Sequence, residues 1–333
     1  MVLRWGICGA GVISNDFVSA LLAPPNNVHE VVCIGARCVN RAQSFADKFG
    51  IKSAYGSYEE VANDPNVDVV YIGVIHISHV TLSKQMLKSG KHVLCEKPMG
   101  ASLTQILEVQ EVAREFGKFF MEGIWSRCFP VYRKIKEEVL SGKLGEIKHV
   151  QAQFCKPINK VERVAKPELG GGGLHNLGIY PIQLATMIFN NQKPERITAD
   201  GTLSDLGVDE ASCITLTYKN GGRAVLIYST MYGAGKNNKA TIYGTNGIIE
   251  LNENFWCPVE ATLPSGKVSN ELAVGPVSYN YSNSGGLRFE ADCVKECIEA
   301  GKLECCEMSF ADSQAVYHII DEVVKQIGMD VKW

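Results

Sequence analysis

A glycine pattern near the start of the chain has the residue types needed to hold a dinucleotide. The stretch GAGVIS contains Gly9 and Gly11, followed by Val12, Ile13 and Ser14. It lies between an apolar run, LRWGIC, and a helical pattern, ISNDFVSALLA. Glycines at such a turn let the backbone approach a pyrophosphate at the helix N-terminus. We therefore predict that Gly9, Gly11, Val12 and Ile13 bind a cofactor. Ser14, in place of a third glycine, weakens the match, and an ordinary glycine turn is the alternative.

Two arginines after the next strand-like run indicate which cofactor it is. The run EVVCIGAR ends in Arg37, Arg41 follows one helical turn later, and no acid lies between them. An NAD site usually has an acidic residue here for the ribose 2′-hydroxyl, whereas a guanidinium suits the 2′-phosphate of NADP. We predict NADP, bound by Arg37 and Arg41. The alternative is two solvated surface arginines.

The stretch CEKPMG places charged residues where a buried strand reaches the surface. The strand-like run KHVLC leads into Glu96, Lys97 and Pro98. Ligands of open parallel sheets bind at the carboxyl ends of the strands, so Lys97 can bring an ammonium to a ligand. We assign Glu96 and Lys97 to the cofactor site, with Glu96 either pairing with the lysine or holding the loop. The alternative is a solvated lysine in a turn.

Composition excludes several other classes of function. The chain has 333 residues, is 46% hydrophobic and carries a net charge of −3, so we expect no nucleic-acid partner. Its apolar runs are too short to span a bilayer, and the first strand leaves no room for a signal peptide. We expect a cytoplasmic protein whose twelve cysteines are mostly reduced core thiols.

The order of the patterns predicts two domains. Up to about residue 123, near-continuous apolar strands alternate with helices, which is typical of a doubly wound parallel sheet of the Rossmann type. Strands with hairpin turns at 220–222 and 245–247 dominate afterwards, and helices are expected at about 131–140, 287–299 and 309–327. We predict an NADP-binding Rossmann domain at 1–123. Residues 124–333 are expected to form an α+β domain with a large, mostly antiparallel open sheet, and its C-terminal helix could pack back on the first domain.

Several motifs together resemble the Gfo/Idh/MocA oxidoreductase family. They are GAGVIS, HISH, CEKPMG and GGGLHNLGIY, and the resemblance covers nearly the whole chain. It is greatest to the dihydrodiol dehydrogenase branch, whose members also act on D-xylose. The resemblance implies hydride transfer between NADP and a sugar or diol, with Lys97 and Tyr180 as catalytic residues. It also implies a cis bond before Pro98 and a homodimer formed through the second domain's sheet.

The resemblance assigns further residues to the site. It places the loop with His76 and His79 near the nicotinamide, whereas a metal site would need a third ligand that the spacing does not supply. No metal is therefore expected. Tyr180 would be the acid and base, with its pKa lowered by the Lys97 ammonium. A core tyrosine is the alternative.

The substrate side departs from the family pattern at one position. The family usually has an aspartate four residues before the catalytic tyrosine, where this chain has Asn176. An amide can orient a hydroxyl but cannot carry charge. We expect Asn176 and Tyr180 to share a helix face and His175 to lie beside them. The aromatic residues Trp125, Phe154 and Tyr281 are candidate walls of the substrate cleft, with plain core packing as the alternative.

The sequence therefore predicts an NADP-dependent dehydrogenase of sugars or trans-dihydrodiols. Two other functions use the same fold. One is a non-catalytic NADP sensor, which would need neither Lys97 nor Tyr180. The other is an NAD-dependent glycosidase, which Arg37 disfavours.

Overall fold

Contacts along the chain divide the computed structural model into two units, which we describe separately. The structure describes residues 2–331 and Trp333. The first unit comprises the residues up to Gly100 together with Thr104–Cys128 and Glu271–Phe310. The second comprises Ala101–Leu103, Phe129–Asn270 and the residues from Ala311 onward. The domain boundary between residues 123 and 124 itself remains a prediction.

The first unit is built on a six-stranded parallel sheet with the strand order β3-β2-β1-β4-β5-β6. Its strands are β1 (Leu3–Cys8), β2 (His29–Gly35), β3 (Ser53–Tyr55), β4 (Val69–Ile72), β5 (His92–Glu96) and β6 (Phe120–Gly123). Every residue of β4 and β6 is buried, as expected for strands covered on both faces. The predicted doubly wound Rossmann sheet is confirmed.

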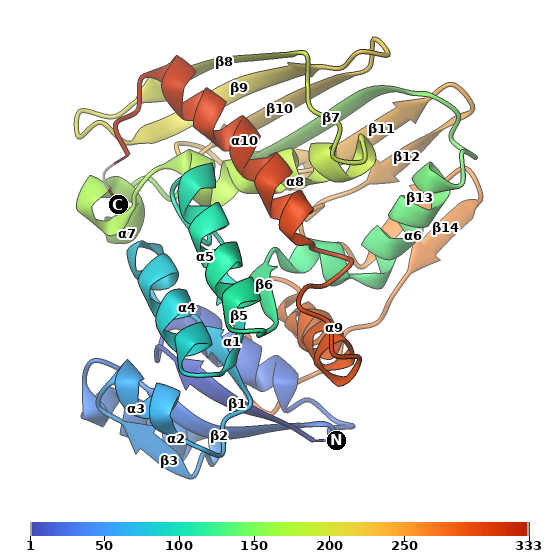
Figure 1. Cartoon of the computed structure of the whole chain (residues 1–333). Helices are drawn as coiled ribbons and strands as arrows, with labels where there is room; N and C mark the ends of the chain where they lie inside the picture. Colours follow the sequence, from blue (N-terminus) through green and yellow to red (C-terminus); the bar gives the residue numbers. More distant parts are fainter. Residues whose placement is uncertain (1, 332) are drawn as a thin grey trace. The chain divides into compact units, whose positions relative to one another are not determined.

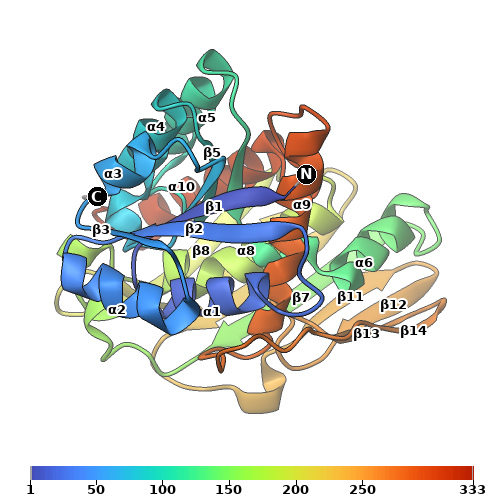
Figure 2. The same cartoon turned by 90° about the horizontal axis from the view of Figure 1, so that it is seen from below.

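Helices cover both faces of this sheet. They are α1 (Val12–Leu21), α2 (Val39–Phe49), α3 (Tyr58–Asn63), α4 (His79–Lys88), α5 (Leu103–Glu115) and α9 (Leu287–Glu299). Figure 2 shows α1 and α2 on one face and α3, α4 and α5 on the other. The predicted short capped helix is α3, where the Ser57 hydroxyl accepts a hydrogen bond from the Glu60 N–H.

The second unit is built on an eight-stranded sheet with the order β14-β13-β12-β11-β7-β10-β9-β8. Its strands are β7 (Ile147–Cys155), β8 (Arg196–Leu203), β9 (Asp209–Thr217), β10 (Arg223–Ser229), β11 (Ala240–Gly244), β12 (Gly247–Leu251), β13 (Glu260–Leu263) and β14 (Gly266–Ser269). All pairs are antiparallel except β7 with β10. The predicted mostly antiparallel sheet and both hairpins are confirmed.

The helices of the second unit include α6 (Pro130–Leu140), α7 (Glu162–Ala165), α8 (Ile179–Ile188) and α10 (Phe310–Ile327). In Figure 1, α6 and α8 lie on the same side of the sheet. Along β10, residues alternate between buried and more exposed, so one face of the strand packs on the core. The predicted helices at 131–140, 287–299 and 309–327 correspond to α6, α9 and α10.

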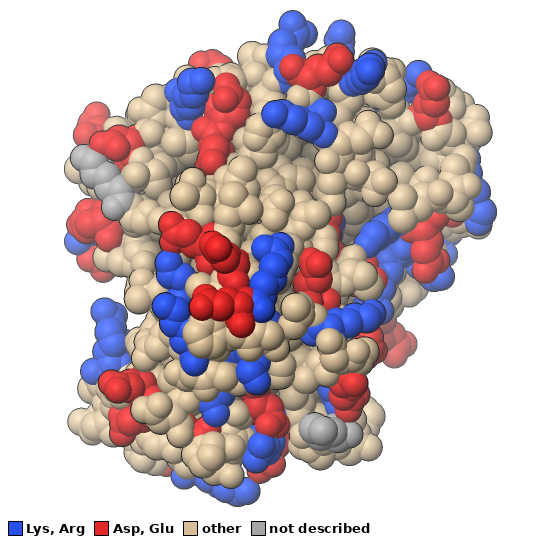
Figure 3. Space-filling view, viewed as in Figure 1, with Lys and Arg blue, Asp and Glu red and all other residues tan. Residues whose placement is uncertain are grey.

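The cysteines and surface charges follow an ordinary distribution. Nine of the twelve cysteines are buried, and Cys38, Cys213 and Cys306 are exposed. Lysine and arginine are interspersed with aspartate and glutamate among the described residues on the face that Figure 3 shows. No helix within residues 2–331 is both long and apolar enough to cross a membrane.

Candidate active site

The phosphate loop has no room for a side chain at Gly9. The backbone there has φ +104°, and a Cβ would lie 2.9 Å from the Val74 side chain and 3.0 Å from the Gly73 carbonyl oxygen. Ser14 fits where a third glycine was expected because its neighbour, Gly73, has no side chain; a Cβ on Gly73 would clash with Ser14 Oγ. Helix α1 therefore packs closely on the sheet despite the serine.

The start of α1 is suited to an anion. Gly11 is the N-cap, Val12 and Ile13 begin the helix, and its first turn contains no acidic side chain. The first N–H groups of a helix have no partner within the helix, and the helix dipole makes this end positive. A pyrophosphate therefore fits this position, with the bare backbone of Gly9 beside it.

Arg37 and Arg41 lie beside this loop. Arg37 comes two residues after β2 ends, and Arg41 donates a hydrogen bond of 3.4 Å from Nη2 to the Ala10 carbonyl oxygen. Burial raises the pKa of Tyr58, while both guanidiniums act in the opposite direction, so both are within electrostatic reach of this phenol. Arg41 thus contacts the phosphate loop, both guanidiniums act on the same phenol, and both arginines are exposed.

His79 joins the loops that follow β4 and β5. Its side chain is buried, with Nδ1 2.8 Å from the Pro98 carbonyl oxygen and Nε2 3.0 Å from that of Val74. Burial lowers its pKa to about 4, so the ring is neutral and donates to one of these carbonyls. The His76 ring lies edge-on to it at 6.4 Å between centroids. Cofactor contacts of both histidines remain predictions.

Glu96 is buried at the end of β5 and accepts two hydrogen bonds. The Tyr71 hydroxyl donates to Oε1 at 2.7 Å, and the Lys97 backbone N–H donates to Oε2 at 3.2 Å. Burial raises the pKa of Glu96, and the hydrogen bonds and the Lys97 charge oppose this. The Lys97–Pro98 peptide bond is cis, as the family resemblance implied.

In the second unit, Asn176 is held by two short hydrogen bonds. Arg163 donates from Nη1 to the Asn176 side-chain oxygen at 2.6 Å, and Asn176 Nδ2 donates to the Gly172 carbonyl oxygen at 2.6 Å. His175 is fully buried, with Nε2 3.2 Å from the Ala101 carbonyl oxygen, and its ring lies 5.1 Å from that of Trp333. Asn176 therefore has a fixed orientation, and its oxygen faces a cation.

The segment around Asn176 is not a continuous α-helix. A π-helical turn covers Leu174–Gly178 and α8 begins at Ile179, so an i, i+4 spacing does not by itself put Asn176 and Tyr180 on one face. The Tyr228 ring packs so closely against this turn that a Cβ on Gly178 would lie 2.7 Å from the ring. Such turns occur often at functional sites.

An aromatic cluster lies beside Tyr180. The Phe154 ring lies 5.7 Å from that of Tyr180 and stacks on Trp256 at 3.7 Å and 13°. Phe255 packs edge-on to both Phe154 and Trp256. Tyr180 is 7% exposed, and Trp256 is partly exposed. Sequence reasoning missed Trp256, although the aromatic pair FW shortly before a proline was a signal that could have drawn attention to it.

Trp125 and Tyr281 belong to the first unit. Trp125 is buried and Tyr281 is exposed. The Asp16 carboxylate of α1 holds the segment around Tyr281, since it accepts hydrogen bonds from the backbone N–H groups of Asn280 and Tyr281 and from the Ser284 hydroxyl. Asp16 thus ties this segment to the helix of the phosphate loop, a role that the sequence did not indicate.

The predicted residues fall into two groups. The first unit brings together the phosphate loop, the two arginines, the two histidines, Glu96 and Lys97, whereas Phe154, His175, Asn176 and Tyr180 belong to the second. The pairing of Lys97 with Tyr180 therefore remains a prediction. Within the described residues, no three His, Cys, Asp or Glu side chains are arranged to hold a metal ion.

Comparison with known proteins identifies the class. Residues 3–124 match the profile described as an oxidoreductase family with an NAD-binding Rossmann fold. Residues 132–250 match the GFO/IDH/MocA C-terminal domain. The protein is an oxidoreductase that binds a nicotinamide dinucleotide. The chain belongs to the Gfo/Idh/MocA family, as its motifs suggested.

Named relatives match this chain over almost its full length. A trans-1,2-dihydrobenzene-1,2-diol dehydrogenase from Xenopus tropicalis is 41% identical over 99% of both chains. One of the same name from Danio rerio is 40% identical over 99% of this chain and 98% of its own. Because these relatives are named dehydrogenases, neither the sensor nor the glycosidase alternative is favoured.

Solved structures share the fold. An aldose-aldose oxidoreductase from Caulobacter crescentus, complexed with glycerol, is 20% identical over 98% of both chains, with a TM-score of 0.83. The 3-ketoreductase KijD10 from Actinomadura kijaniata, in complex with NADP and TDP-benzene, is 24% identical over 98% of both chains, with a TM-score of 0.79.

Proposed function

We propose that this protein is an NADP-dependent dehydrogenase that oxidises a cyclic trans-dihydrodiol or reduces the corresponding hydroxyketone. The observation that carries this is the environment of Tyr180, whose ring lies beside Phe154, on which Trp256 stacks. Aromatic faces favour a flat apolar ring, and the phenol lies next to them. The full-length relatives named as dihydrodiol dehydrogenases support the same substrate class.

The phosphate loop and two arginines fit NADP rather than NAD. The bare backbone at Gly9 and the N-terminus of α1 would receive the pyrophosphate. Arg37 and Arg41 would hold the 2′-phosphate, and no acidic residue lies between them in the sequence to favour a 2′-hydroxyl. His76, His79 and Glu96 complete the predicted cofactor site at the same edge of the sheet.

Tyr180 moves the proton in this mechanism. NADP, when bound, supplies the hydride acceptor for the carbon that bears the reacting hydroxyl. The Tyr180 phenolate takes the proton of that hydroxyl in oxidation and returns it to the ketone oxygen in reduction. The Lys97 ammonium stabilises the phenolate, and Asn176 orients the substrate hydroxyl.

A sugar such as D-xylose is the second candidate substrate. The observation that favours it is the polar pair of Arg163 and Asn176, whose 2.6 Å hydrogen bond puts amide and guanidinium groups near the same helix turn. Such donors suit a polyhydroxylated ring. Tyr180 would have the same role with either substrate.

Enzyme assays with Tyr180→Phe test the proposal. Wild-type protein and variant are mixed with NADP and a panel of trans-dihydrodiols and aldoses, and NADPH formation is followed. We expect wild-type activity with at least one of these classes and about a 10²–10⁴-fold loss of turnover in the variant, with NADP affinity unchanged. Near wild-type turnover in the variant would assign proton transfer to another group.

The remaining proposals concern the roles of the two domains, the location of the protein and its oligomeric state. Residues 1–123 would bind NADP, and residues 124–333 would bind substrate and form a cytoplasmic homodimer through the outer face of the sheet. The more exposed residues of that face, including Gln151, Val225 and Tyr243, mix polar and apolar groups as interfaces do. Light scattering at micromolar concentration tests this; a monomer mass would exclude the dimer.

A further inference from the structure

Glu290 is a buried acid for which the reaction above has no use. It lies in α9 and is fully buried, and neither carboxylate oxygen has a hydrogen-bond partner within the part of the chain that the structure describes. An unpaired charge in such a place costs several kcal/mol, so the group should be neutral. Burial, and then the charge of Glu96, raise the pKa of Glu290 well above its usual value.

Glu96 and Glu290 approach each other across Gly123. Gly123 ends β6 and pairs with Glu96 in the sheet. A Cβ on Gly123 would lie 3.5 Å from Glu290 Oε2 and 3.5 Å from Glu96 Cα. The two acidic residues therefore flank one bare stretch of backbone, with no side chain to separate them.

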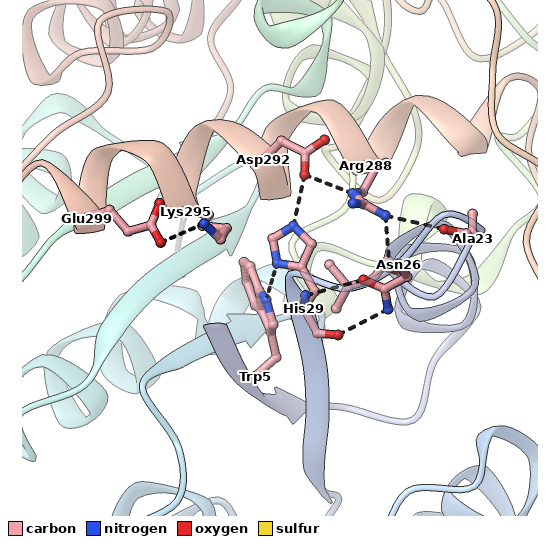
Figure 4. Close-up of polar contacts among 9 residues, drawn as sticks. Trp5, Ala23, Asn26, His29, Arg288, Asp292, Lys295 and Glu299 are labelled. Atoms are coloured by element: carbon pink, nitrogen blue, oxygen red, sulfur yellow. Dashed lines mark hydrogen bonds and ion pairs between the residues drawn. The ribbon is translucent and has the colours of Figure 1, made fainter. Parts of the chain in front are cut away.

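Helix α9 is anchored, so Glu290 is held in this place. Asp292, on the same helix, contacts His29 Nε2 at 2.9 Å and accepts a hydrogen bond of 2.8 Å from Arg288 (Figure 4). Arg288 also donates to the Leu21 and Ala23 carbonyl oxygens. These contacts connect α9 to β2 and to the end of α1.

The neighbouring groups decide which acid is charged. Glu96 accepts hydrogen bonds from Tyr71 on β4 and from the backbone of Lys97, and the Lys97 ammonium acts on it electrostatically. Glu122 on β6 raises the pKa of Glu96 further, and its carboxylate accepts a hydrogen bond from the Met99 N–H at 3.0 Å. Two neighbouring carboxylates in a dry site cannot both ionise, and donors favour ionisation of the acid that receives them.

Other ionisable groups on the elements around the pair have partners or are neutral. Cys95 on β5 is buried, which raises its pKa, so it stays a thiol. Asp16 on α1 is occupied by the segment around Asn280. Arg127 lies buried in the Trp125–Cys128 turn, which packs on α9. His79, the neighbour of Pro98, is neutral.

We propose that Glu96 and Glu290 form a carboxyl pair that holds one proton at neutral pH, with the proton on Glu290 and the charge on Glu96. Glu290 is then a positioning residue, because the single charge on Glu96 holds the Lys97 ammonium. Loss of the proton at high pH would add a second negative charge and draw Lys97 away from its catalytic position. This catalytic consequence rests on the proposed function, whereas the location of the proton does not.

Infrared spectroscopy of the whole protein tests the location of the proton. A protonated carboxyl group has a carbonyl stretch, shifted in D₂O, that is distinct from the carboxylate bands. We expect this band at pH 7.5 in wild type and in Glu96→Gln, its loss in Glu290→Gln, and its return at a changed frequency in Glu290→Asp. Asp209→Asn is the matched control, since burial raises the pKa of Asp209 only to about 6 and this acid is ionised at pH 7.5.

Two infrared results would overturn the proposal. One is a wild-type spectrum without the band, and the other is a band that persists in Glu290→Gln. The pH dependence of turnover tests the consequence for Lys97: the basic limb should move to higher pH in Glu290→Gln, where no second charge can form, and an unshifted profile would contradict it. If wild type oxidises neither diols nor sugars, the proposed function fails, and the infrared result still decides the carboxyl pair.

Discussion

Arg163 donates a hydrogen bond of 2.6 Å to the side-chain oxygen of Asn176, at the position where the family usually has an aspartate. The amide nitrogen of Asn176 is used as well, in a 2.6 Å hydrogen bond to the Gly172 carbonyl oxygen. The arginine therefore meets a neutral partner, and its positive charge is not cancelled at this point. The departure from the family pattern thus leaves the second unit more positive beside Tyr180's helix.

Replacing Asn176 by aspartate should change substrate preference. In Asn176→Asp the Arg163 contact becomes a charged pair, and the donor to Gly172 is lost, which leaves two acceptors facing each other. We expect kcat/KM for diols and for sugars to change by different factors, with NADP affinity unchanged. Steady-state kinetics across the substrate panel measure this.

The double variant Arg163→Gln with Asn176→Asp provides the control, because it removes the cation and keeps the carboxylate. If the single variant has the kinetics of wild type for every substrate between pH 6 and pH 9, position 176 does not contact the substrate.

Arg37 should determine the choice between NADP and NAD. In Arg37→Asp a charge-assisted contact to the 2′-phosphate is replaced by repulsion, which should cost at least about 1.5–3 kcal/mol, or more than about tenfold in Kd. NAD lacks that phosphate, so its affinity should fall little. Titration of both cofactors into wild type and variant measures this.

Lys52→Asp is the matched control for this experiment. Lys52 is in the same unit and is 81% exposed, so the substitution makes the same change in charge without a phosphate contact. Equal loss of NADP and NAD binding in Arg37→Asp would mean that Arg37 does not recognise the 2′-phosphate.

The fold could be predicted because its strands and helices carry strong local patterns. β4 and β5 are nearly uninterrupted apolar runs, and α9 and α10 coincide with the expected segments. β13 and β14 were not predicted, since each has only four residues and GKVS shows no clear alternation. Short elements of this kind are stabilised by their neighbours in the sheet rather than by their own sequence.

The site was only partly predictable, for a different reason. The spacing of Gly9 and Gly11 and the lack of an acidic residue between Arg37 and Arg41 are local features, so the phosphate loop and Arg37 could be found in the sequence. Trp256 and Glu290 gain their significance from residues far away in the chain, namely Phe154 and Glu96. The π-helical turn at Leu174–Gly178 packs against Tyr228, which is distant in the chain, so no local pattern shows this contact.

Lys97 should matter for its charge. In Lys97→Met the protein should still bind NADP but lose most of its turnover. In the reduction direction, where the Tyr180 phenol donates the proton, the basic limb of the pH profile should move to higher pH as the phenol loses its cation. Arginine at this position should not restore activity, because a planar guanidinium differs in shape from a compact ammonium. An active Lys97→Met enzyme with an unshifted profile would make Lys97 a solvated residue in a turn.

Asp292 should contribute stability that depends on pH. Burial raises its pKa, but the hydrogen bonds from His29 and Arg288 outweigh this, so the pKa in the folded protein is lower than usual. A carboxyl group whose pKa is lowered by folding stabilises the fold at pH values above its pKa in the unfolded chain, which is about 3.9. This stabilisation is lost as the pH falls through the pKa of the group in the folded protein. Because the side chain is 40% exposed, we expect Asp292→Asn to lower the free energy of unfolding by only about 1 kcal/mol at pH 7.

Urea unfolding of wild type and Asp292→Asn from pH 7 down to pH 3 measures this dependence. The difference between the two proteins should be constant down to about pH 5 and shrink below about pH 4, where the carboxyl group becomes protonated. Glu299→Gln is the control on the same helix: its 2.6 Å ion pair with Lys295 lies within α9, whereas Asp292 contacts the buried His29 of β2, so the loss of Glu299 should have less effect (Figure 4). A difference that stays the same at every pH would show that Asp292 stabilises α9 through packing and neutral hydrogen bonds, and that its charge does not anchor the helix carrying Glu290.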